Sequence, residues 1–168
     1  MKKALTLFVA LIMAVVVSAQ NTTAKMPDAS TATIDWTVGT SVQYSYQGSS
    51  NVGVSAFATI GNDWKLRISG CIPGLVPVKG FDRYGSVLIG GSYNFTDWLY
   101  ALIEVGASVN PSIPTKVGFA VGGGVGFQFD FGKRSRISTE LGTEVAENNL
   151  KWLITPYCKV GYSIRLKL

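Results

Sequence analysis

The chain has 168 residues and a formal net charge of +5, and 47% of its residues are hydrophobic. This length is enough for one domain. Lys2 and Lys3 supply part of the positive charge, and the remaining excess is small and scattered, which argues against a nucleic-acid-binding protein. After residue 19, no uninterrupted apolar stretch reaches the ~20 residues that a membrane-spanning helix needs. High hydrophobicity without such a stretch favours strands.

The first 19 residues have the three parts of a secretory signal peptide. Two lysines follow the initial methionine, an apolar run covers residues 4–17, and the small residues at 17–19 form a cleavage motif. The apolar run is too short to cross a bilayer as a helix. We therefore expect residues 1–19 to be a signal peptide. Residues 20–35 are rich in Thr, Ser and Ala, and we expect a flexible periplasmic tail there.

From Trp36 to the end of the chain, apolar and polar residues alternate, which is the pattern of strands with one apolar face. Pieces of about 10 such residues, separated by turn residues, are typical of membrane β-barrels, which must close because an open edge is costly in lipid. The predicted fold is all-β, an eight-stranded antiparallel up-and-down transmembrane β-barrel over residues 36–168. Its predicted strands are Trp36–Tyr46, Val52–Ile60, Trp64–Cys71, Tyr84–Phe95, Trp98–Val109, Val117–Phe129, Ile137–Val145 and Leu150–Leu168.

The predicted links between these strands alternate in length. Short links are expected at 61–63, 96–97 and 130–136, and longer ones at 47–51, 72–83, 110–116 and 146–149. Outer-membrane barrels have short periplasmic turns and longer extracellular loops. The pattern therefore predicts a protein of the bacterial outer membrane with both termini in the periplasm.

Aromatic residues gather near the predicted strand ends, where two girdles at the level of the lipid headgroups are expected. The periplasmic girdle would contain Trp36, Trp64, Phe95, Trp98, Phe129, Phe131 and Tyr162. The outer girdle would contain Tyr44, Tyr46, Tyr84, Phe119 and Trp152.

Two segments carry a resemblance to a known group of proteins. Residues 93–99, Tyr-Asn-Phe-Thr-Asp-Trp-Leu, combine a strand, a tight polar turn and a second strand, and residues 160–168 form an alternating terminal strand. With the eight-strand plan, they resemble the small OmpA/OmpX-type and opacity-protein-like outer-membrane barrels. The resemblance implies a monomer in outer-membrane lipid whose last strand is read by the outer-membrane assembly machinery. Those proteins usually end in an aromatic residue, whereas this chain ends in Leu168.

Polar side chains occupy every second position of each strand, and we call these positions the polar parity of the strands. The polar parity is expected to face the barrel interior. It carries seven charged residues, Lys65, Arg67, Glu104, Glu140, Glu144, Lys159 and Arg165, and Lys151 could join them near the outer rim. Buried charges need partners, and an eight-stranded interior is just wide enough to be filled by side chains. We therefore predict an interior plugged by ion pairs and water. Glycines of the strand 117–129 would leave room for the long charged chains.

No enzymatic activity, metal or cofactor is expected. The chain has no His, so a Ser-His-Asp arrangement cannot be built. Glu140 and Glu144 would lie about 13 Å apart on one strand, too far to act together. Cys71 and Cys158 fall on strands that are not neighbours, which favours two free thiols.

Three functions stay open at this point. The first is an outer-membrane barrel with a structural or surface-contact role, in which the apolar loop 72–83 could contact a partner. The second is a narrow pore for ions or small solutes. The third is a soluble lipocalin-like barrel that binds lipid, in which the apolar parity would face inward.

Overall fold

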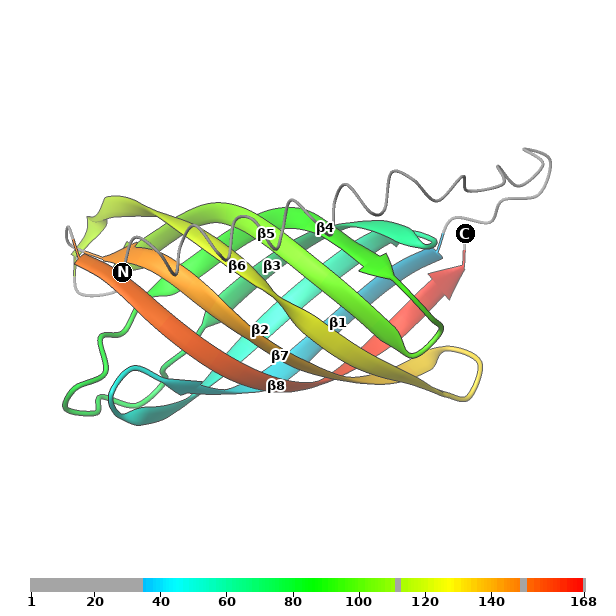
Figure 1. The fold of residues 1–168 in the computed structure, drawn as a ribbon, viewed down its shortest axis with the longest axis horizontal. Coiled ribbons are helices and arrows are strands. Elements are labelled where there is room, and N and C mark those ends of the chain that lie inside the picture. The colour runs from blue at the N-terminus through cyan, green and yellow to red at the C-terminus, as the bar shows by residue number, and fades with distance from the viewer. Residues whose placement is uncertain (1–34, 111–112, 149–150, 168) are drawn as a thin grey trace. The chain divides into compact units, whose positions relative to one another are not determined.

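The structure, a computed structural model, describes residues 35–110, 113–148 and 151–167. In these residues each strand pairs antiparallel with the next and the first pairs with the last, giving a closed barrel (Figure 1). The predicted eight-stranded up-and-down barrel is thus confirmed. The strands are β1 (Asp35–Tyr46), β2 (Ser50–Gly61), β3 (Trp64–Ile72), β4 (Gly85–Asn94), β5 (Leu99–Asn110), β6 (Ile113–Phe131), β7 (Ser135–Asn148) and β8 (Lys151–Lys167). The predicted signal peptide and tail lie outside the described residues, except for Asp35.

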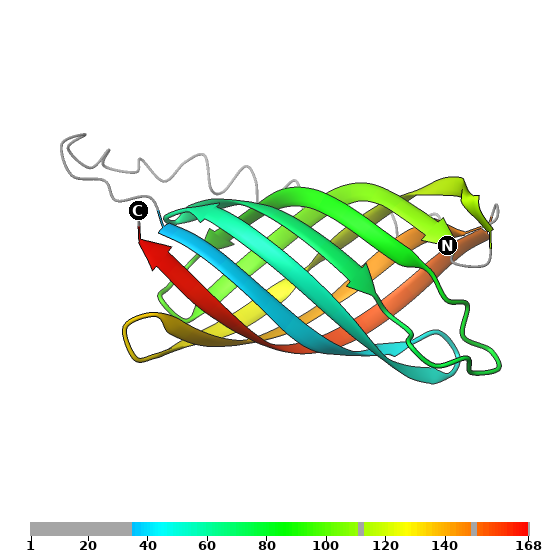
Figure 2. The ribbon, with the colours of Figure 1, turned by 180° about the vertical axis from the view of Figure 1, so that it is seen from behind.

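Strand β1 begins where strand β8 ends, because Asp35 is paired with Lys167 (Figure 2). We call this end of the barrel the terminal end and the opposite end the loop end. At the terminal end the strands are joined by residues 62–63, 95–98 and 132–134. The loop end has one much longer connection, residues 73–84, between β3 and β4.

The predictions of two long links, at residues 110–116 and 146–149, are wrong. Residues 110–116 and 146–149 were assigned to loops, but most of them belong to strands, and only 111–112 and 149–150 separate β5 from β6 and β7 from β8. Backbone pairing continues past the clear alternation, since Ala146 pairs with Leu153. The pairing of β5 with β6 shifts in register next to Asn110. Such an irregularity hides a strand from a search for strict period-two alternation.

The apolar parity of the strands faces outward and the polar parity faces inward. Val42 and Val160 are 58% and 55% exposed, whereas Gln43 and Thr155 are fully buried. This arrangement follows from the period of two along a strand. A lipocalin-like barrel would have the opposite arrangement, so the hypothesis of a soluble lipid-binding barrel is wrong.

Most of the aromatic residues predicted for the two girdles lie on the outer surface. These are Trp36, Trp64, Phe95, Trp98, Phe129, Phe131 and Tyr162 toward the terminal end, and Tyr44, Tyr46, Phe119 and Trp152 toward the loop end. The prediction that Tyr84 belongs to the outer girdle is wrong. Its side chain is fully buried inside the barrel, in a small apolar cluster with Leu88 and two alanines. Tyr84 lies at an even distance along the chain from the inward-facing Ser86 and Leu88. The alternation in the sequence therefore already indicated that its side chain faces inward.

Two glycines let aromatic rings pack directly against the backbone inside the barrel. A Cβ atom added at Gly126 would lie 2.2 Å from Cζ of Tyr100, and one added at Gly142 would lie 2.6 Å from the hydroxyl oxygen of Tyr157. Glycine was expected on β6 to make room for charged chains. At Gly126 the room is used by a tyrosine ring.

We expect Gly126→Ala to lower the free energy of unfolding by about 1–3 kcal/mol, because the added methyl group must displace the Tyr100 ring in a filled interior. The measurement is urea-induced unfolding of the protein in detergent micelles. Gly91→Ala is the matched control, since an added Cβ there would meet its nearest atom at 3.7 Å, an ordinary contact. Equal stability of the two variants would contradict this account of the packing.

Candidate functional site

Arg67 on β3 is the centre of an ion cluster in the middle of the barrel. Its Nη1 and Nη2 atoms donate to Oε1 and Oε2 of Glu140 on β7, at 2.6 and 3.2 Å. Its Nε atom lies 3.3 Å from Oε1 of Glu104 on β5. The three side chains are at most 4% exposed. A two-point contact between a guanidinium and a carboxylate is among the strongest hydrogen-bonded pairs in proteins.

Two aromatic side chains complete this cluster. The Tyr100 hydroxyl donates to Oε1 of Glu140 at 2.7 Å. The guanidinium carbon of Arg67 lies 4.5 Å from the centroid of the Phe57 ring, within the range of a cation–π interaction. Phe57 interrupts the polar parity of β2, and its contact with Arg67 explains why an aromatic residue stands there. We call Arg67, Glu104, Glu140, Tyr100 and Phe57 the central cluster.

Two other predicted interior charges lie nearer the loop end and outside the central cluster. Lys159 Nζ lies 4.2 Å from the centroid of the Tyr157 ring, and Glu144 is 1% exposed. Within the described part of the chain, neither Lys159 nor Glu144 forms an ion pair with another side chain. Also toward the loop end, the free thiol of Cys71 donates to Oε1 of Gln43 at 2.9 Å.

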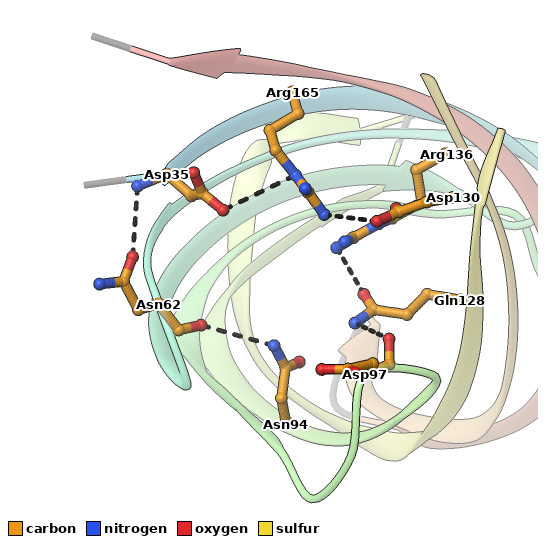
Figure 3. Close-up of polar contacts among 8 residues, drawn as sticks. All are labelled: Asp35, Asn62, Asn94, Asp97, Gln128, Asp130, Arg136 and Arg165. Carbon is orange, nitrogen blue, oxygen red and sulfur yellow. Dashed lines mark hydrogen bonds and ion pairs between the residues drawn. The ribbon is translucent and has the colours of Figure 1, made fainter. Parts of the chain in front are cut away.

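A second group of polar contacts lies at the terminal end (Figure 3). Arg165 on β8 donates from Nη2 to Oδ2 of Asp130 on β6 at 2.9 Å, and its Nε lies 3.6 Å from Oδ2 of Asp35 on β1. Arg136 on β7 donates from Nε to Oδ1 of Asp130 at 2.6 Å and from Nη1 to Oε1 of Gln128 at 2.7 Å. Asp130 therefore bridges the two arginines, and Arg165 joins the first strand to the last.

The same contacts continue around the barrel opening (Figure 3). Gln128 Nε2 donates to the carbonyl oxygen of Asp97 at 3.0 Å. Asn94 Nδ2 donates to the carbonyl oxygen of Asn62 at 3.4 Å, and the backbone amide of Asp35 donates to Oδ1 of Asn62 at 3.4 Å. We call the eight residues of Figure 3 the mouth network, and they are Asp35, Asn62, Asn94, Asp97, Gln128, Asp130, Arg136 and Arg165.

Most residues of the mouth network were not predicted from the sequence. Asp130 and Arg136 were assigned to a link, although they continue the inward parity of Gln128 on β6 and of Ser138 on β7. This continued alternation was the sequence signal that could have identified Asp130 and Arg136 as inward-facing residues. Of the predicted interior charges, Arg165 belongs to this network, Lys65 is 9% exposed beside it, and Lys151 is exposed at the loop end.

Two cavities lie along the barrel axis on the terminal side of the central cluster. The inner one has a volume of about 30 Å³ and is lined by Arg67 and Tyr100 on one side and by Gln128 and Arg136 on the other. The outer one, the mouth cavity, has a volume of about 470 Å³ and is lined by the mouth network together with Asp63 and Lys65.

In the described ranges, no group of three or more His, Cys, Asp or Glu side chains could hold a metal ion. Among the described residues there is also no apolar helix of membrane-spanning length.

Comparisons with known proteins identify the class of the fold. No protein-family model and no curated protein matches the sequence. Neisserial surface protein A matches with a TM-score of 0.54 and 12% identity over 80% of this chain and 97% of that chain. Ail, the attachment invasion locus protein of Yersinia pestis, matches with a TM-score of 0.50 and 14% identity over 81% of this chain and all of that chain. The chain therefore has the fold of the small eight-stranded outer-membrane barrels, as its resemblance to them predicted.

We expect Arg67→Met to lower the free energy of unfolding by about 3–5 kcal/mol, because it leaves two buried carboxylates without their cation. Urea-induced unfolding in detergent micelles measures this change. Arg134→Met is the matched control, because Arg134 is exposed in the turn between β6 and β7. A loss as small as that of the control would show that the central cluster contributes little to stability.

Removal of the Arg165 side-chain charge should loosen the seam between β1 and β8. In Arg165→Gln we expect amide hydrogen exchange at the terminal end of this seam to accelerate by up to about fivefold, since partly exposed ion pairs contribute up to about 1 kcal/mol. Exchange elsewhere in the barrel should stay unchanged. Lys133→Gln, in the exposed turn 132–134, is the control. Unchanged protection of the seam in Arg165→Gln would rule out this role.

Proposed function

We propose that the protein is an outer-membrane β-barrel with a structural or surface-contact role, and that the central cluster closes its interior to ions. The observation that carries this proposal is the contact of Arg67 with Glu140 across the barrel, at 2.6 Å, together with the ion pair between Arg67 Nε and Glu104 at 3.3 Å. The narrow pore remains the alternative, and the experiment below distinguishes the two functions.

The outer surface supports a location in a membrane. A closed barrel has no strand edge with unsatisfied backbone groups, and its outward apolar side chains suit a lipid environment. Exposed aromatic residues toward both ends suit the two headgroup regions. The likeness to outer-membrane barrels supports the outer membrane, and the long connection 73–84 supports an outward-facing loop end with both termini in the periplasm.

The size of the inner cavity supports a closed interior. Its volume of about 30 Å³ is enough for one or two water molecules, at about 10–15 Å³ each. A hydrated ion needs more room than this. The side chains between this cavity and the loop end include Arg67, Glu104 and Glu140, which hold one another in place.

The connection 73–84 supports a surface-contact role. Its backbone is fixed to the barrel, because Leu75 N donates to the carbonyl oxygen of Val52 and Asn51 Nδ2 donates to that of Val76. The side chains of Leu75 and Val76 are nevertheless 47% and 59% exposed. Exposed apolar side chains on a fixed loop are typical of contact surfaces.

Catalysis has no support among the residues of the interior. The chain lacks His, and the carboxylates of Glu104 and Glu140 are both engaged by Arg67. A carboxylate that is paired in this way is poorly suited to act as a general base. We therefore propose no enzymatic activity.

Conductance in planar lipid bilayers tests this function. We expect the protein purified from the outer-membrane fraction to show no steady open events. A variant with Arg67, Glu104 and Glu140 all changed to Ser should conduct, because it replaces the central cluster with small neutral side chains. Lys133→Gln is the control and should behave like the unaltered protein. Steady events in the unaltered protein that disappear on neutralising Glu104 or Arg67 would establish the pore instead.

A further inference from the structure

Lys65 is a largely buried residue that lines the mouth cavity and has no ion pair in the described chain. It is 9% exposed, it lies on β3, and it lines both the inner cavity and the mouth cavity. In the described chain, no ion pair within 4.0 Å joins its ammonium group to a carboxylate, and Asp35, Asp130 and Asp63 act on it only from a longer distance. Because Lys65 lines the open mouth cavity and has no close counterion, an oxyanion supplied from outside can pair with its ammonium group there.

The other cations of the mouth cavity are already paired. Arg136 and Arg165 contact the carboxylates of Asp130 and Asp35, so that two cations balance two anions. The charge of Lys65 is left over. The inner wall of the mouth cavity therefore has a surplus of one positive charge.

The outer edge of the same cavity is negative. Asp63 and Asp97 lie in the turns 62–63 and 95–98, both are exposed, and both line the cavity. Neither carboxylate forms an ion pair within the described residues. A cavity with a positive inner wall and a negative edge is complementary to a ligand that is negative at its inner end and positive at its outer end.

We propose that the mouth cavity binds a zwitterionic amino acid or the zwitterionic end of a peptide. The carboxylate of the ligand accepts hydrogen bonds from Lys65 Nζ, and its ammonium group lies beside Asp63 and Asp97. The volume of about 470 Å³ is within the range of small-molecule sites. The mouth network fixes the cavity wall before the ligand arrives, which lowers the entropic cost of binding.

This site is separate from the closed interior that we propose above. It lies on the terminal side of the inner cavity, and its ligand would not have to pass the central cluster. A barrel that does not conduct could bind such a ligand, and a barrel that conducts could fail to bind it.

Titration of the isotope-labelled protein in detergent micelles, followed by amide NMR shifts, tests the proposal. The probes are L-alanine, which carries both charges, acetate, which is only an anion, and methylammonium, which is only a cation. We expect saturable shifts for residues 61–65 and 94–98 with L-alanine, and at least tenfold weaker binding of the other two probes. No saturable shift with L-alanine, or acetate binding as tightly as L-alanine, would overturn the proposal.

Variants assign the site to Lys65. Lys65→Gln should weaken L-alanine binding at least tenfold, Lys65→Arg should retain it, and Lys133→Gln should leave it unchanged as the matched lysine of the same end. Asp97→Asn should weaken L-alanine binding without weakening acetate binding, which tests the site even if Lys65→Gln does not fold. If folded Lys65→Gln bound L-alanine as tightly as the unaltered protein does, the assignment would be contradicted. The same holds if Asp97→Asn bound L-alanine as tightly as the unaltered protein.

Discussion

The contact of Arg67 with Glu140 is the interaction on which the interior of the barrel depends. The outer face of the strands is apolar, so the alternate residues, which are polar, are turned into a narrow interior. There a charge can be stabilised only by another side chain or by water. Arg67 reaches two carboxylates at once, because its side chain extends from β3 across the interior to Glu104 on β5 and Glu140 on β7. Tyr100 and Phe57 then fill the space around the three charges.

The central cluster and the mouth cavity have different consequences for the proposed function. In the centre, Arg67 forms ion pairs with Glu140 and Glu104 at 2.6 and 3.3 Å, and the inner cavity beside them has a volume of about 30 Å³. At the terminal end, the mouth network lines a cavity of about 470 Å³, and Lys65 remains unpaired there among the described side chains. In the function that we propose, the centre opposes the passage of ions, whereas the mouth cavity is open to small polar ligands.

The period of two along each strand made most of the fold predictable from the sequence. It placed Arg67, Glu104 and Glu140 on the inner face, because their parity is fixed once the outer face is apolar. It failed where the register of β5 with β6 shifts next to Asn110. Tyr84 was assigned by its aromatic character, whereas its parity with Ser86 places it inside.

The partners within the interior could not be predicted in the same way. Parity gives the face of a side chain but not its neighbour across the barrel, which depends on register and strand tilt. Arg67 could have paired with Glu144, and Glu140 with Lys159, its direct neighbour in the register of β7 with β8. The mouth network was missed because Asp130 and Arg136 were assigned to a turn, although β6 and β7 continue through them.

A double-mutant cycle of Arg67→Met and Glu140→Gln tests the central claim most directly. It compares the free energies of unfolding of the two single variants, the double variant and the unaltered protein in detergent micelles. Because the two side chains form one buried contact, we predict a coupling energy of at least about 1.5 kcal/mol. Additive effects, with a coupling below about 0.5 kcal/mol, would contradict the account.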